Sequence, residues 1–163
     1  MDYRHTQAVQ ETADKISEAE EETEDFGKGK SSETLYNLLE TLELRSDIPR
    51  IRISSIEPNL LTPKIINMVS QPEKFMPHLH VPLQSGSNRI LKLMKRRYTK
   101  GYYIDKINLM KQKIPNISIG VDVITGFPSE TEKDFFETYN LLSNLEVSYL
   151  HVFPYSEREN TSG

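Results

Sequence analysis

No cysteine occurs among the 163 residues of the chain. This absence excludes disulfides, thiolate zinc sites and any cysteine-ligated iron–sulfur cluster that the chain could hold alone. The sequence also lacks an apolar run of about 18 residues, and its N-terminus lacks the basic and apolar regions of a signal peptide. We therefore expect a soluble, cytoplasmic protein with no membrane partner.

Hydrophobic residues are scarce, at 36% of the chain, while 27% of the residues are charged. The shortage is concentrated in residues 1–34, which include the acidic run from Glu18 to Asp25. We expect residues 1–34 to form an acidic, partly disordered or helical lead-in, and residues 35–163 to form the folded domain. The formal net charge of −4 predicts no attraction of the whole chain to nucleic acid.

From Leu35 onward, helical and strand patterns alternate. Four short strands are expected to begin near residues 51, 79, 117 and 149, with helical segments between them. Short strands that are linked by helices pair in parallel through right-handed crossovers. The pattern predicts an α/β fold, either an open sheet or a partial parallel βα barrel of about four units, because four strands are too few to close a barrel.

Local signals refine this prediction. The candidate helix N-caps are Ser31 or Ser32, Thr62, Ser87, Thr99, and Ser129 in a capping box with Glu132. The β-branched run 117–124 is typical of a strand buried on both faces. The helix after the capping box is expected to bury Phe135, Tyr139, Leu142 and Leu145, at helical spacing.

The carboxyl ends of the four strands share one chemical character. In parallel α/β folds, ligands bind at these ends, which here are residues 54–58, 83–87, 122–126 and 155–158. Small and hydrogen-bonding side chains also belong in ordinary βα turns. Four ends of the same kind, with Glu57, Gln84 and Asp122 in apolar settings, favour a ligand-binding rim.

His78 and His80 form an HxH pair on one face of a strand, and His151 is a possible third ligand. A metal-dependent barrel hydrolase is therefore one alternative. The pair is expected at the beginning of its strand, which is the end of a barrel that serves stability. We interpret these histidines as structural and expect no metal ligand in the chain.

One dense basic cluster follows the second strand. It consists of Lys92, Lys95, Arg96, Arg97 and Lys100. The cluster could contact RNA phosphates, or it could be the solvated face of a helix whose apolar face holds Ile90, Leu91 and Met94.

Several segments resemble, in order, signatures of the methylthiotransferase family of radical-SAM enzymes. These segments are residues 53–58, 80–87, 94–98, 120–131 and 151–156. Residues 25–29 and 75–78 are most similar to the bacterial branch that acts on threonylcarbamoyladenosine beside the tRNA anticodon. The resemblance covers roughly residues 25–161.

The resemblance implies a TIM-like barrel that binds S-adenosylmethionine (SAM) and a [4Fe–4S] cluster. In that family, a 5′-deoxyadenosyl radical abstracts hydrogen from C2 of the adenine, a second cluster helps to supply sulfur, and another SAM supplies the methyl group. The resemblance assigns cofactor contacts to residues at the strand ends, namely Ser55, Glu57, Gln84, Ser85, Asp122, Val123, Thr125, Phe153 and Tyr155. Glu130 is expected to support a helix start.

The chain departs from the family in several places. The cluster-binding CxxxCxxC loop, the cysteines of the auxiliary cluster and the C-terminal RNA-binding module are absent. Residues 19–24, which replace a buried family strand, carry four glutamates, and burying unpaired carboxylates costs several kcal/mol each. We expect a fragment that is inactive alone, with no catalytic residue of its own. The alternative is a non-enzymatic interaction domain that pairs with a partner chain, or with itself, through open sheet edges.

Overall fold

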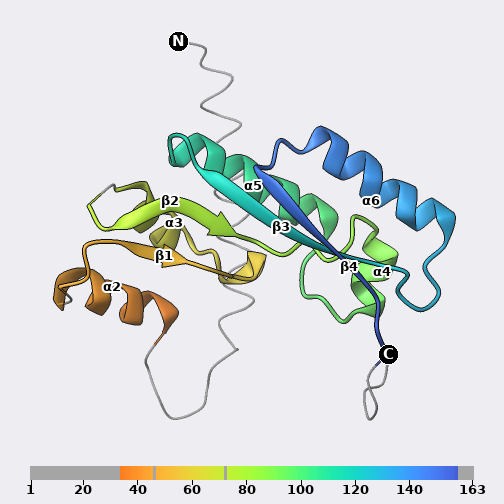
Figure 1. Cartoon of the computed structure of the whole chain (residues 1–163), viewed down its shortest axis with the longest axis horizontal. Helices are drawn as coiled ribbons and strands as arrows, with labels where there is room; N and C mark the ends of the chain where they lie inside the picture. The colour runs from red at the N-terminus through yellow and green to blue at the C-terminus, as the bar shows by residue number, and fades with distance from the viewer. Residues whose placement is uncertain (1–33, 46, 72, 158–163) are drawn as a thin grey trace.

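The computed structural model describes residues 34–45, 47–71 and 73–157. The predicted acidic lead-in and the caps proposed at Ser31 and Ser32 lie outside the described residues. The elements, in chain order, are α2 (Leu35–Arg45), β1 (Ile51–Ile53), the short 3₁₀ helix η1 (Pro58–Leu60), α3 (Pro63–Ser70), β2 (Phe75–His80), α4 (Asn88–Leu93), α5 (Lys100–Lys113), β3 (Ser118–Thr125), α6 (Glu132–Asn144) and β4 (Tyr149–Pro154) (Figure 1). None of the helices in these ranges is long and apolar enough to cross a membrane.

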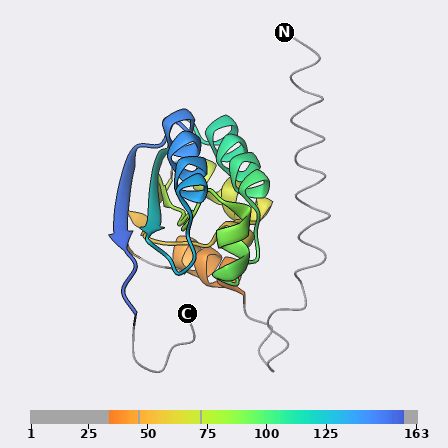
Figure 2. The same cartoon turned by 90° about the vertical axis from the view of Figure 1, so that its right-hand side faces the viewer.

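The four strands form one sheet in the order β1-β2-β3-β4, and every neighbouring pair is parallel. Sequential order with right-handed crossovers places the connecting helices on one face of the sheet. Figure 2 shows α4, α5 and α6 together on one side of β3 and β4. The predicted α/β fold, consistent with a partial parallel βα barrel, is confirmed.

The second strand begins earlier than predicted and is irregular. Ile51 pairs with Phe75 and Ile53 pairs with Leu79, so an advance of two residues along β1 corresponds to an advance of four along β2. Pro77 lies inside this stretch, and proline cannot donate a hydrogen bond to a neighbouring strand. The strand ends at His80. The HxH pair therefore lies at the carboxyl end of β2, and its predicted place at the beginning of the strand was wrong.

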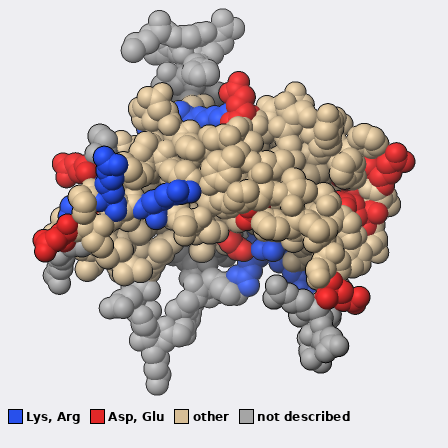
Figure 3. All heavy atoms as spheres, viewed as in Figure 1, with Lys and Arg blue, Asp and Glu red and all other residues tan. Residues whose placement is uncertain are grey.

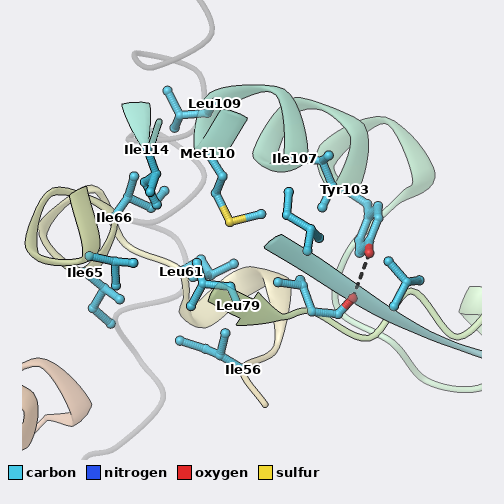
Figure 4. Close-up of a cluster of buried hydrophobic side chains, with 14 of the residues drawn as sticks. Ile56, Leu61, Ile65, Ile66, Leu79, Tyr103, Ile107, Leu109, Met110 and Ile114 are labelled. Carbon is cyan, nitrogen blue, oxygen red and sulfur yellow. Dashed lines mark hydrogen bonds between the residues drawn. The ribbon is translucent and has the colours of Figure 1, made fainter. Parts of the chain in front are cut away.

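The core lies between the sheet and its helices. Leu61, Leu79, Ile107 and Met110 have no exposed surface, and Figure 4 shows them packed together from β2, α5 and the residue that follows η1. The same cluster includes Tyr103, whose hydroxyl donates a 2.7 Å hydrogen bond to the carbonyl of Val81. Burial raises the pKa of Tyr103 strongly, because the charged phenolate would lose its hydration. This tyrosine ties α5 to the chain just beyond β2.

Removing the Tyr103 hydroxyl tests this link. Tyr103→Phe should keep the ring packing but leave the buried carbonyl of Val81 without its side-chain donor. We expect the free energy of unfolding to fall by about 1–2 kcal/mol in urea titrations. A matched change at the exposed Tyr139, Tyr139→Phe, should have almost no effect. Equal losses in the two variants would contradict the assigned link.

The helix caps confirm part of the local prediction. Thr62 accepts a hydrogen bond from the backbone N–H of Ile65, and Thr99 accepts one from Tyr102. Ser87 is the N-cap of α4 by position, but it makes no cap hydrogen bond, because its hydroxyl donates to Asp134.

The predicted start of α6 was wrong. The capping box is formed by Thr131 and Asp134, so Ser129 and Glu132 do not form it. Ser129 has a φ of 69° and lies in the preceding turn. Glu130 lies before the helix, where its carboxylate accepts a hydrogen bond from the backbone N–H of Gly126.

The buried face of α6 also differs from the prediction. Phe135 is 42% exposed and Tyr139 is 58% exposed, whereas Asp134 and Thr138 are buried and Leu145 is buried as expected. The Thr138 hydroxyl accepts a hydrogen bond from the backbone N–H of Gly86. This face is polar because it packs against the backbone of the loop that follows β2.

Candidate functional site

The sheet face opposite the helices carries a cluster of polar side chains from neighbouring strands. The carboxylate oxygen Oδ1 of Asp122 on β3 lies 2.8 Å from Nε2 of His80 on β2. The same oxygen lies 3.2 Å from Nδ1 of His151 on β4. Asp122 and His151 are directly paired in the β3–β4 register. The expectation that residues 117–124 are buried on both faces was therefore wrong for Asp122, whose side chain is 23% exposed.

Tyr149 extends this cluster along the sheet. Its hydroxyl lies 3.1 Å from Nδ1 of His80 and 2.9 Å from Nε2 of His78. The guanidinium of Arg52 on β1 reaches both ring nitrogens of His78, at 3.0 Å each. We call Arg52, His78, Tyr149, His80, Asp122 and His151 the open-face cluster. It spans all four strands, with the Arg52 cation on β1 and the Asp122 carboxylate on β3, between the histidines of β2 and β4.

The environment of His78 disfavours its charged form. Partial burial, followed by the positive charge of Arg52, lowers the pKa of His78 below its ordinary value. His78 is therefore neutral near pH 7. A neutral ring can accept a hydrogen bond from the Arg52 Nε–H at Nδ1 and donate one to the Tyr149 hydroxyl from Nε2.

A glycine makes room for the tyrosine in this cluster. Gly120 precedes Asp122 by two residues on β3, and a Cβ atom there would lie 2.1 Å from the Tyr149 ring. The ring of Tyr149 therefore occupies the space where any other residue would carry its side chain. This close packing positions the Tyr149 hydroxyl between His78 and His80.

The carboxyl ends of the strands lie next to one another, as predicted. The backbone N–H of Ile56 donates to the carbonyl of His80, Gln84 bridges to Val123 in parallel, and Tyr155 donates to Thr125. Gln84 has a φ of 65°, a left-handed conformation that costs energy for a residue with a side chain. Such strain is found at ligand-binding positions more often than elsewhere.

The residues assigned to the cofactor by resemblance fall into two groups. Ser85 and Val123 are buried on the helix side, where the Ser85 hydroxyl contacts that of Thr138 at 3.3 Å. Their side chains offer no surface to a ligand on the open face. The others are half-buried or exposed at the rim, namely Ser55, Glu57, Gln84, Asp122, Thr125, Phe153 and Tyr155.

Besides Asp122, two further rim residues have defined partners. Glu57 accepts a 3.0 Å hydrogen bond from Arg96, which belongs to the basic cluster after α4. Tyr155 packs edge-on against Phe127, with ring centroids 5.2 Å apart. The rim therefore has a charged side near β1 and an aromatic side near β4.

The basic cluster is partly neutralised. Arg96 pairs with Glu57, and Lys100 lies 3.7 Å from a carboxylate oxygen of Glu137. Lys92 and Lys95 are exposed. Figure 3 shows basic side chains near the loop after α4, at the lower edge of the molecule in that view.

The sequence alone did not identify Tyr149 and Arg52 as members of the cluster. A signal did exist, since Tyr149 and His151 alternate on one strand as His78 and His80 do on another. Residues at alternate positions share a face of a sheet. Which strands pair, and in which register, was still needed to place these residues together.

Comparison with known proteins agrees with this architecture. The radical SAM superfamily model matches residues 9–142. The chain is 43% identical over 137 residues to the threonylcarbamoyladenosine tRNA methylthiotransferase MtaB of Bacillus subtilis, covering 83% of this chain and 30% of that protein. It is 46% identical to the MtaB of Aquifex aeolicus, over 78% of this chain and 31% of that protein.

A relative of a second kind is also similar. The tRNA-2-methylthio-N6-dimethylallyladenosine synthase of Staphylococcus haemolyticus is 38% identical, over 78% of this chain and 24% of its own length. The chain thus spans less than a third of the length of these relatives. With four parallel βα units and a family match over most of its residues, the chain belongs to the radical SAM superfamily and is similar to its MtaB-type methylthiotransferases.

Proposed function

We propose that the chain forms the cofactor-facing wall of a tRNA methylthiotransferase that adds a methylthio group to C2 of N6-threonylcarbamoyladenosine. The observation that supports this proposal is the rim of polar and aromatic side chains at the ends of four parallel strands. The identity to two MtaB proteins, 43% and 46%, favours threonylcarbamoyladenosine over dimethylallyladenosine as the modified nucleoside. A tRNA substrate would place the protein in the cytoplasm.

The rim residues fit S-adenosylmethionine, which supplies both the radical and the methyl group in this family. Ser55, Gln84 and Thr125 offer hydroxyl and amide groups that can hydrogen-bond a ribose and an adenine. Phe153 and Tyr155 offer aromatic surface at the other side of the rim, with Phe153 50% exposed. An apolar wall with a few placed polar groups is the usual composition of such a site.

The iron–sulfur cluster does not fit the residues of this chain. Radical-SAM clusters need thiolate ligands, and the chain has no cysteine. We propose that the chain has no catalytic activity alone. After anaerobic reconstitution with iron and sulfide, the purified chain should contain no stoichiometric cluster by iron and sulfide analysis. A stable cluster at one per chain would contradict the proposal.

The tRNA contact is proposed for the basic cluster after α4. Lys92 and Lys95 are exposed, and lysines of this kind contact phosphates without reading sequence. Each phosphate contact that is lost should weaken binding uniformly and reduce the salt dependence of the affinity.

A segment exchange tests the proposed function. Residues 50–157 would replace the matching segment of Bacillus subtilis MtaB, and the chimaera would be expressed in a strain that lacks that enzyme. Mass spectrometry of tRNA should detect the 2-methylthio derivative of threonylcarbamoyladenosine. In the chimaera, Gln84→Ala should lower its level, and Gln112→Ala, at an exposed position of α5, should not.

The same segment placed in the Staphylococcus haemolyticus synthase separates the two nucleosides. We expect the first chimaera to restore most of its methylthio-threonylcarbamoyladenosine product. The second chimaera should restore a smaller share of its methylthio-dimethylallyladenosine product. If the second chimaera is active and the first is folded but inactive, the proposed substrate is wrong.

A further inference from the structure

Three side chains of the open-face cluster place metal-binding atoms together. One potential ligand atom from each of His80, Asp122 and His151 lies within 4.8 Å of the other two. Two imidazoles and one carboxylate are a frequent ligand set for zinc and for other divalent transition metals. We propose that these three residues form a site for one divalent transition-metal ion, with Zn²⁺ as its representative.

The distances suit such an ion. Metal–ligand bonds of roughly 2.0–2.1 Å place neighbouring ligand atoms about 3.3 Å apart around a tetrahedral ion. Oδ1 of Asp122 lies 2.8 Å from Nε2 of His80 and 3.2 Å from Nδ1 of His151. Small side-chain movements would therefore admit the ion.

The sheet holds the three residues in place. Asp122 and His151 are paired in register, and His80 is paired with Gly120, two residues from Asp122. Side chains at these positions share one face of adjacent strands. A site built on three neighbouring strands is more rigid than one built on loops.

The three proposed ligands differ in how far their side chains are exposed to solvent. The side chain of His80 is 9% exposed, that of Asp122 is 23% exposed, and that of His151 is 53% exposed. His80 and Asp122 are therefore held in place by the surrounding side chains, while the exposed imidazole of His151 can change its side-chain conformation to meet an ion. Three protein ligands on one side leave a fourth position for water or another ligand, as in catalytic zinc sites.

Tyr149 orients the buried ligand. Its hydroxyl lies 3.1 Å from Nδ1 of His80, so it can accept a hydrogen bond from an N–H at that nitrogen. In the metal-bound form the ring proton lies on Nδ1, and the lone pair of Nε2 is directed to the ion in place of its present contact with Asp122. Metal-bound histidines almost always donate their second nitrogen to such a partner.

The structure also separates this site from the HxH pair seen in the sequence. Both ring nitrogens of His78 lie 3.0 Å from the Arg52 guanidinium, and one also contacts Tyr149. The adjacent positive charge repels a metal cation. In the proposed site the ligand beside His80 is therefore Asp122, from another strand, and not His78.

Calorimetric titration of the tag-free chain with Zn²⁺ tests the proposal. We expect one ion per chain. Asp122→Asn and His151→Ala should each weaken the affinity by at least about tenfold, and Tyr149→Phe should weaken it by about tenfold. These positions are preferable to the buried His80, because their side chains are at least partly exposed. Circular dichroism would verify that each variant is folded.

Asp105→Asn, at an exposed position of α5, is the matched control and should retain the affinity of the unmodified chain. Co²⁺ provides a second readout, because ligand-field absorption of the bound ion should be lost in His151→Ala. Absence of saturable binding, or equal affinity in Asp122→Asn, His151→Ala and the unmodified chain, would overturn the proposal. The inference does not rest on the proposed methylthiotransferase function, because the titration measures binding and not catalysis.

Discussion

Asp134→Ala should destabilise the chain by about 3 kcal/mol, as measured by urea unfolding. The buried carboxylate accepts a 2.6 Å hydrogen bond from the Ser87 hydroxyl, pairs with Arg89, and caps α6 through Thr131. Alanine would leave the buried hydroxyl of Ser87 without its acceptor. The link between the start of α4 and the start of α6 would also be lost.

Glu132→Ala is the control for this prediction. Glu132 lies in the same first turn of α6 and is exposed, so its loss should change the stability by less than about 0.5 kcal/mol. If the two variants lose equal stability, a general effect of helix charge explains the result and the assigned network does not.

The same carboxyl group makes the stability depend on pH. Its hydrogen bond with the Arg89 guanidinium, followed by those with the Ser87 and Thr131 hydroxyls, holds the pKa of Asp134 well below its usual range. The folded chain therefore binds this proton more weakly than the unfolded chain does. The stabilisation is complete above the ordinary aspartate pKa of about 3.9 and is lost as the pH falls below it. Asp134→Asn should remove this part of the acid sensitivity.

Gly86→Ala should also cost about 3 kcal/mol, because it overpacks a contact between two backbones. A Cβ atom at Gly86 would lie 2.6 Å from the Cα atom of Thr138 on α6. Backbone atoms cannot turn away as the end of a side chain can. The loop after β2 would have to move away from α6 and lose the 2.8 Å hydrogen bond from Gly86 to Thr138.

Gly101→Ala provides the matched control. Gly101 lies in α5, and the nearest atom to its added Cβ, Oγ1 of Thr99, is 3.9 Å away, an ordinary contact. Alanine favours helices by up to about 1 kcal/mol over glycine, so this variant should be as stable as the unmodified chain or more stable. A Gly86→Ala protein with unchanged stability would show that α6 does not pack as described.

The sequence was sufficient to predict the sheet. Strand patterns separated by helical segments predict parallel neighbours, and the observed order confirms this. The caps at Thr62 and Thr99 were also predictable, since each needs only the few residues that follow it. These features depend on local chemistry and on general rules of chain connection.

The face of α6 was not predictable in the same way. Hydrophobic spacing selected Phe135 and Tyr139, but α6 packs through Asp134 and Thr138 against a polar loop. The spacing of hydrophobic residues gives no signal for an interface that is made by polar side chains. The partner of Asp134, Ser87, lies 47 residues away, so the pairing emerges only from the fold.

The open-face cluster shows the same limit. His78 and His80 were visible as a pair because they are two residues apart; they were weighed as metal ligands and interpreted as structural. The contact between Asp122 and His151 depends on the register of β3 and β4, which the sequence pattern does not specify. Asp122 was predicted at the rim for different reasons, its place at the end of an apolar strand and the family resemblance.

Titration of the metal-free chain with S-adenosylmethionine, followed by backbone amide NMR, tests the central claim most directly. The claim is that the ends of the four strands form one cofactor-binding rim. We expect saturable shifts of the amide signals of Gln84, Thr125 and Tyr155, and none at exposed positions of α5 such as Gln112. Absence of saturable shifts at high ligand concentration, or shifts confined to the helix-covered side, would contradict the claim.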